Sequence, residues 1–192
     1  MMEKQLAHID YLHELISELD EEIEKRMTPF SEDLELLDSI PGVGKRNAEQ
    51  ILAEIGTDMS RFPTHGHLCS WAGMTPGHDE SAGKKKSAKT RKGNKKLRSA
   101  LTEAARAASR QKNTYLSAQY HRIAARHGKN RAAIAVGHTI LSLVHILLTR
   151  KQEYVDLGFD YFDQRKEDIL ICQSVKRLKS LGLTVTVQEK TA

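Results

Sequence analysis

The sequence predicts an all-α fold with one minor strand near the C-terminus. Apolar residues recur at helical spacing along most of the 192 residues, and glycine and proline interrupt that pattern at intervals. The segment LTVTV (183–187) alternates as a short strand does. We expect three parts: an N-terminal coiled-coil helix (1–30), a helical domain that contains a helix-hairpin-helix unit (31–150), and a basic helical tail with the short strand (151–192).

Residues 2–26 are predicted to form one long helix that self-associates. Isoleucine recurs every seven residues and leucine falls at the intervening position, at Ile9, Leu12, Ile16, Leu19 and Ile23. This pattern is typical of parallel two-stranded coiled coils, so we expect a homo-oligomer through this helix. The alternative is that the apolar stripe packs on the chain's own domain.

A second unit, LLDSIPGVGKRNAEQIL (36–52), predicts a helix, a glycine turn and another helix. Gly42 and Gly44 let the backbone turn tightly and approach a phosphate, and the amides at the start of the second helix point at that anion. Lys45 and Arg46 add positive charge. Such a helix-hairpin-helix binds the DNA backbone without reading its sequence. The alternative is a plain glycine turn between two helices.

Positive charge is concentrated in residues 84–131, which hold 16 Lys/Arg against one acid, whereas the whole chain has a net charge of +5. Residues 1–38 are acidic, with 12 Asp/Glu against three Lys/Arg. A basic block near a glycine turn indicates a polyanion, most simply nucleic acid, and the alternative is a solvated basic face. The residues expected to line the nucleic-acid path are Lys84, Lys85, Lys86, Arg91, Lys92, Lys95, Lys96 and Arg98.

The remaining composition bears on location and metal binding. Two distant cysteines, Cys69 and Cys172, and an N-terminus without a signal-peptide pattern favour a cytoplasmic protein. The apolar run 132–148 is expected to be a buried core helix and not a membrane span. His65, His67 and Cys69 lack the ligand spacing of the usual structural zinc sites, so no metal or other cofactor is expected in this chain.

Ser81 lies in the segment GHDESAGKKKSAKTRKGNKK (77–96), just before three lysines. A serine hydroxyl is a weak nucleophile that a base or a metal must activate. Nearby cations would hold a phosphodiester and stabilise charge in phosphoryl transfer. On chemistry alone a turn serine is the ordinary interpretation. We expect residues 73–94 to be mainly loop, with room for a short extended piece.

Four motifs resemble, in order, the C-terminal domain of the insertion-sequence-110 family of transposases: SIPGVGKRNAEQILAEIG, RFPTHGHLCSWAGMTPG, ESAG and RKGNKKLRSALTEAA. The resemblance covers roughly residues 34–150 and extends weakly into the tail. It implies DNA transposition by a recombinase of a mobile element. It also implies an N-terminal RuvC-like domain with four acidic metal ligands, a serine that links covalently to DNA, and a structured guide RNA.

Carried onto this chain, the resemblance implies that Ser81 is the catalytic serine, with Ala82 inserted into the Ser-Gly motif; Ser87 is the next candidate. Nothing in residues 1–38 resembles the RuvC-like domain. We therefore expect a truncated or split form that is inactive without that domain, in which the divalent metal would be held. Two alternatives remain open: a non-enzymatic dimeric DNA-binding protein and an inactive transposase remnant.

Overall fold

The computed structural model describes the backbone of residues 2–77, 79–81, 84–87, 90–182 and 184, and their side chains except at 79–81, 84–87 and 168. Within those ranges the predicted all-α fold is confirmed, with a single two-stranded sheet added. The helices are α1 (Met2–Met27), α2 (Ser31–Asp38), α3 (Lys45–Ile55), α4 (His65–Trp71), α5 (Lys95–Ala108), α6 (Tyr115–His127), α7 (Lys129–Arg150) and α8 (Tyr161–Ser180). Two 3-10 turns, η1 (Thr28–Phe30) and η2 (Met59–Arg61), complete the helical elements.

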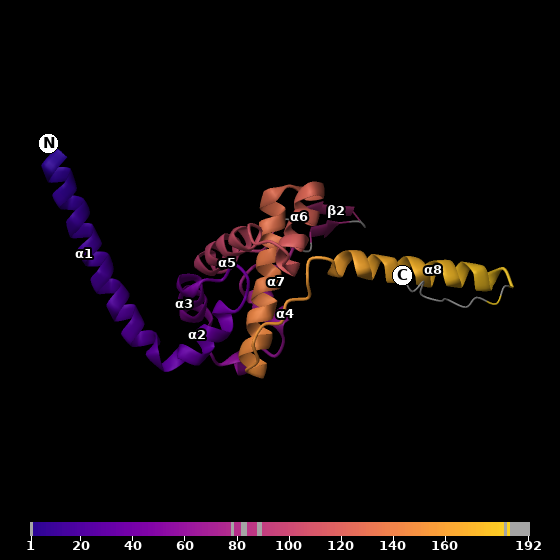
Figure 1. Ribbon diagram of the computed structural model, residues 1–192, viewed down its shortest axis with the longest axis horizontal. Coiled ribbons are helices and arrows are strands. Elements are labelled where there is room, and N and C mark those ends of the chain that lie inside the picture. Colours follow the sequence, from indigo (N-terminus) through magenta and orange to yellow (C-terminus); the bar gives the residue numbers. More distant parts are fainter. Residues whose placement is uncertain (1, 78, 82–83, 88–89, 183, 185–192) are drawn as a thin grey trace.

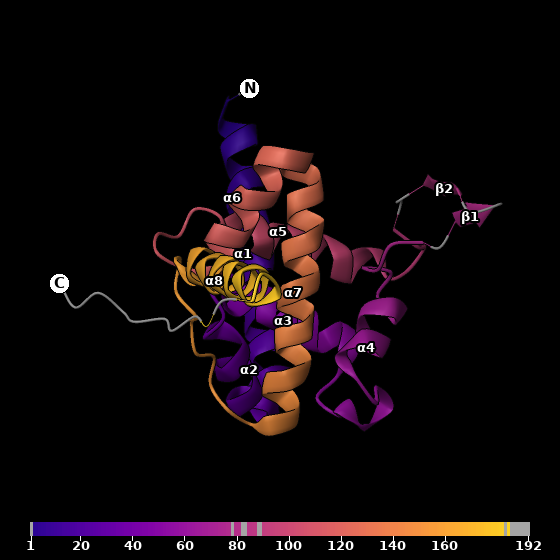
Figure 2. The ribbon, with the colours of Figure 1, turned by 90° about the vertical axis from the view of Figure 1, so that its right-hand side faces the viewer.

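The core is built around α7, which packs against α2, α4, α5 and α6 (Figure 2). Its buried side chains include Val136, Ile140, Leu141 and Val144, and they meet the buried face of α5. By length and composition α7 could cross a membrane, but 56% of its most apolar 18-residue window is buried inside the protein. The predicted core helix is therefore observed, and it fixes the positions of the helices around it.

Helix α1 extends away from this core as a separate rod (Figure 1). None of its residues is buried. The heptad side chains from Ile9 to Leu19 are 42–62% exposed, whereas Ile23 is partly buried. The alternative in which this stripe packs on the chain's own domain therefore does not hold for the exposed part of the stripe, from Ile9 to Leu19. The helix runs directly into η1, where Pro29 and the Thr28 hydroxyl, which donates to the Glu24 carbonyl at 2.8 Å, mark the bend into α2.

The described part of segment 73–94 is mainly irregular, as predicted, and a short extended piece is present. It contains an antiparallel hairpin of β1 (Asp79–Ser81) and β2 (Lys84–Ser87), and an isolated bridge joins Pro76 to Thr90 further back. Figure 2 shows this hairpin standing out from the helical body. We call residues 74–92 the arm. The pairing of two strands was not predicted, because DESAGKKKS lacks the β-branched alternation that usually indicates strands.

The C-terminal tail forms α8, close to the predicted basic helix, and projects from the core on the side opposite α1 (Figure 1). Its first turn is attached to α6. The Phe162 ring stacks on Tyr115 with 5.0 Å between ring centroids, and Arg122 donates to Asp163 at 2.9 Å. The predicted strand at 183–187 lies outside the described residues except for Thr184.

Candidate nucleic-acid interface

The glycine turn between α2 and α3 is shaped by its contact with α5. Gly42 has a φ of +88°, and a Cβ there would lie 2.4 Å from the amide nitrogen of Ala108 and 2.5 Å from the carbonyl oxygen of Ala104. Gly44 has an extended backbone, with nothing within 4 Å of the place a Cβ would take. Gly42 is thus required for packing against α5, whereas Gly44 leaves the backbone open to an approaching ligand.

Helix α3 begins at Lys45, and Gly44 provides no side chain to cap it. The first amides of a helix point outward and favour an anion. Lys45 and Arg46 in the first turn are both exposed. This end of α3 therefore combines open backbone donors with two cations, which is the arrangement expected from the sequence.

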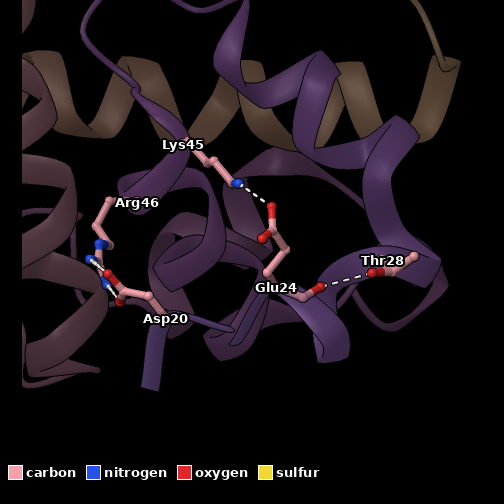
Figure 3. Close-up of polar contacts among 5 residues, drawn as sticks. All are labelled: Asp20, Glu24, Thr28, Lys45 and Arg46. Carbon is pink, nitrogen blue, oxygen red and sulfur yellow. Dashed lines mark hydrogen bonds and ion pairs between the residues drawn. The ribbon is translucent and has the colours of Figure 1, made fainter. Parts of the chain in front are cut away.

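Both cations already have carboxylate partners on α1 (Figure 3). Lys45 Nζ lies 2.9 Å from Glu24 Oε1, and the Arg46 guanidinium makes two parallel bonds of 2.6 and 2.7 Å to Asp20. Glu24 raises the pKa of Lys45, and Asp20 raises that of Arg46, because each hydrogen bond stabilises the charged form. The sequence did not reveal these acids as partners, since it shows only that residues 1–38 are acidic.

The second candidate cluster lies at the start of α5. Asn94 caps this helix: its side-chain oxygen accepts from the amides of Lys96 and Leu97 at 3.0 and 3.1 Å, and its amide nitrogen donates to Glu54 at 2.5 Å. The helix start is thus satisfied internally, so anion binding here would depend on side-chain charge. The exposed cations at this end are Arg91, Lys92, Lys95 and Lys96.

Arg98 holds the base of the arm. Its Nη2 donates to the carbonyl oxygens of Gly73 and Arg91, at 2.6 and 2.7 Å, and so joins the two chain segments that enter and leave the arm. Gly73 and Gly93 lie so close that a Cβ on Gly73 would be 2.8 Å from Gly93 Cα. Arg98, which the sequence placed on the nucleic-acid path, thus lies in the structure as the clamp of the arm.

Ser81 is the last residue of β1 and pairs in register with Lys84 at the start of β2. Lys85 and Lys86 follow on the same strand. Their side chains lie outside the described part of the structure, as does the backbone of Ala82 and Gly83. The backbone alone places Ser81 at the tip of the arm beside the three lysines, as their proximity in the sequence suggested.

The two clusters lie at opposite ends of one helix pair. The glycine turn contacts the last residues of α5, whereas Glu54, near the end of α3, reaches Asn94 at the start of α5. Helices α3 and α5 are therefore antiparallel neighbours. At 1.5 Å per residue, the 14 residues of α5 separate the glycine turn from the base of the arm by about 20 Å.

Within the described ranges no group of three or more His, Cys, Asp or Glu is placed to hold a metal ion. His67 Nδ1 faces the Thr64 hydroxyl at 2.9 Å, and Cys69 is buried beside Ser142. Burial, with a smaller effect from His65, lowers the pKa of His138. The metal that the family resemblance implies therefore has no donor set among the residues with described side chains.

Open helix-start amides, exposed cations and a protruding basic arm are features of a protein that binds a polyanion. Comparison with known proteins indicates which kind of polyanion-binding protein this chain resembles. The model of the Transposase IS116/IS110/IS902 family matches residues 34–122, from α2 to the middle of α6. This supports the resemblance to that family inferred from the sequence.

Three known proteins are similar to this chain in sequence. The chain is 31% identical over 149 residues to the transposase for insertion sequence element IS1111A of Coxiella burnetii, covering 73% of this chain and 39% of that protein. It is 37% identical over 99 residues to a pilin gene-inverting protein of Moraxella bovis, covering 49% of this chain and 30% of that protein. A pilin gene-inverting protein of Moraxella lacunata is 44% identical over 68 residues, covering 34% of this chain and 21% of that protein. The chain thus spans about two fifths or less of the length of these relatives.

Proposed function

We propose that this chain is the DNA-binding and strand-joining part of a transposase or recombinase of a mobile element. The observation that carries the proposal is that the family match covers the part of the fold that positions both basic clusters. Residues 34–122 include the glycine turn, the arm, its Arg98 clamp and α5. The glycine turn and the base of the arm are thus both attached to the helix pair α3 and α5.

The proposed DNA path has two contact points. At the glycine turn, Gly44, Lys45 and Arg46 would hold backbone phosphates, with Gly42 shaping the turn against α5. At the other end of α5, the exposed lysines and the arm would hold a second stretch of the backbone. Such contacts fix position without reading sequence. The cations proposed at this second end are Lys84, Lys85, Lys86, Arg91, Lys92, Lys95 and Lys96.

Salt dependence of duplex binding tests this path. Lys92, Lys95 and Lys96 changed together to Gln should flatten the log–log salt slope by about 0.9 for each phosphate that the protein no longer neutralises. Fluorescence anisotropy on a labelled duplex measures it. The matched control changes three exposed cations outside the path, Lys4, Lys25 and Arg150, to Gln. Equal slopes in the two triple variants would mean that the path residues face solvent.

For catalysis we propose that Ser81 is the nucleophile, as the resemblance implies. Its hydroxyl oxygen would bond to a DNA phosphorus while the phosphorus–oxygen bond to one deoxyribose breaks. The serine proton leaves with a base, and the departing oxygen becomes a free hydroxyl. The resemblance implies that a RuvC-like domain, in cis or in trans, holds the divalent metal for this chemistry.

Covalent capture of DNA tests the serine. With a RuvC-like domain and Mg²⁺ supplied, Ser81→Ala should abolish the protein–DNA adduct detected on a denaturing gel. Ser87→Ala, six residues further along the arm, is the matched control and should keep the adduct. An adduct that survives in Ser81→Ala but is abolished in Ser87→Ala would move the assignment to Ser87.

We also propose that α1 pairs with α1 of a second copy, because its heptad side chains from Ile9 to Leu19 are exposed and no residue of α1 is fully buried. A parallel pair would place two cores and their arms side by side.

The basic surface would further suit the structured guide RNA that the resemblance implies, and the proposed location is the cytoplasm. The same exposed α1 also suits the alternative function, a dimeric DNA-binding protein without catalysis.

A further inference from the structure

The acidic end of α1 covers the two cations of the glycine turn. Asp20 and Glu24 are four residues apart, so they lie on one face of the helix, and that face is turned toward the start of α3 (Figure 3). Arg46 is held by both oxygens of Asp20, at 2.6 and 2.7 Å, and Lys45 by Glu24 at 2.9 Å. The two proposed phosphate-binding side chains are therefore occupied by an anion of the chain itself.

A carboxylate takes the same place that a phosphate would take. The forked guanidinium of arginine binds two oxygens of either group in the same planar geometry. Lys45 is a point charge that serves either anion. A phosphate brought to the start of α3 would therefore compete with Asp20 and Glu24 for the same donors.

The contact is weak enough to be displaced. The paired side chains are 42–69% exposed, and no residue of α1 is buried. Clefts of about 350 and 390 Å³ lie beside the Lys45–Glu24 pair, so tight packing does not hold α1 against α3 here. Exposed ion pairs each change an equilibrium by at most about fivefold and weaken as salt is added.

We propose that Asp20 and Glu24 form an internal competitor that occupies Lys45 and Arg46 until DNA phosphates displace it. The inference rests on the proposed function and adds regulation to the same site. In the absence of DNA the charges of Lys45 and Arg46 are neutralised by the two carboxylates. When a duplex binds, the end of α1 is released from α3.

Neutralising the two acids tests the competitor. Asp20→Asn with Glu24→Gln should bind a labelled duplex about 2- to 25-fold more tightly than wild type at low salt, and the increase should shrink as salt rises. The matched control is Glu14→Gln with Glu18→Gln. It removes the same charge from the same exposed helix, at residues without a cation partner among the described side chains. The affinity of the control should rise little.

A second pair of variants separates the inference from the proposed function. With Lys45 and Arg46 both changed to Gln, neutralising Asp20 and Glu24 should raise affinity no more than the control does. If wild type binds duplex and the acid variant binds no more tightly than the control, the competitor is refuted while the DNA path stands. If neither wild type nor the acid variant binds duplex at low salt, the proposed function itself fails.

Discussion

At the scale of single residues, two glycines two positions apart have different roles. Gly42 combines a positive φ with a backbone-to-backbone contact on α5, whereas Gly44 has an ordinary extended backbone and open space beside it. The sequence predicts the same role for both glycines, because the pattern PGVG shows only that the backbone can turn there. The contact that makes one of them irreplaceable comes from a helix more than 50 residues further along the chain.

Gly42→Ala should lower the free energy of unfolding by about 2 to 4 kcal/mol, because the methyl group meets the Ala104 and Ala108 backbone and the left-handed conformation is strained. Gly44→Ala is the matched control and should cost less than about 1 kcal/mol. Urea unfolding followed by circular dichroism measures both. Similar losses in the two variants would contradict the tight contact between the glycine turn and α5.

At the scale of elements, the arm is held together at its base, where its two chain segments contact each other. Arg98 joins the carbonyls of Gly73 and Arg91, the Arg91 amide donates to the Thr75 carbonyl at 3.3 Å, and Gly93 packs on Gly73. These contacts gather at the base, next to the rigid start of α5. The position of Ser81 therefore depends on a residue whose charge first suggested a DNA contact.

Arg98→Met should loosen the arm while the core stays folded. Loss of a hydrogen bond from a charged donor costs about 1.5–3 kcal/mol, and each 1.4 kcal/mol is a factor of ten. Exchange of the Arg91 amide hydrogen, which bonds to the Thr75 carbonyl, should thus quicken about tenfold or more. The control, Lys95→Met, removes an exposed cation in the same helical turn and should leave that exchange unchanged. Unchanged exchange in Arg98→Met would refute the clamp.

The sequence predicted most helices because their apolar spacing and their glycine or proline boundaries are local signals. The expected long helix at 2–26, the two helices of the unit at 36–52 and the core helix at 132–148 are observed with their ends shifted by a few residues. The features that the sequence could not predict depend on contacts between residues far apart in the chain. The α1 acids lie 21 and 26 residues from their partners on α3, and their alignment follows from the bend at η1.

At the scale of the whole molecule, the chain is a compact core with two exposed helices, α1 and α8, that leave it in opposite directions (Figure 1). The core buries the apolar faces of α2 to α7, whereas α1 keeps its stripe in solvent. Long exposed stripes are costly in water unless they are covered. The heptad spacing makes a second α1 the covering partner that fits best.

Ile9→Lys with Ile16→Lys should turn a dimer into a monomer in sedimentation equilibrium, because two like charges would face each other at the seam. The thermal unfolding of the core should hardly change, since neither residue contacts it. The control, Tyr11→Lys with Ser17→Lys, adds the same charge to the same helix away from the seam. A wild-type chain that is already monomeric at high concentration would contradict self-association through α1.

The length of α5 sets a minimum footprint for the proposed DNA ligand. Both its ends are anchored, by Gly42 on Ala108 and by Asn94 on Glu54, so the spacing of about 20 Å between the two contact points is rigid. Duplex DNA rises about 3.4 Å per base pair, so this spacing corresponds to roughly six base pairs. A duplex shorter than that would reach one end of the helix pair only, and affinity should rise in a step once a duplex is long enough to bridge both.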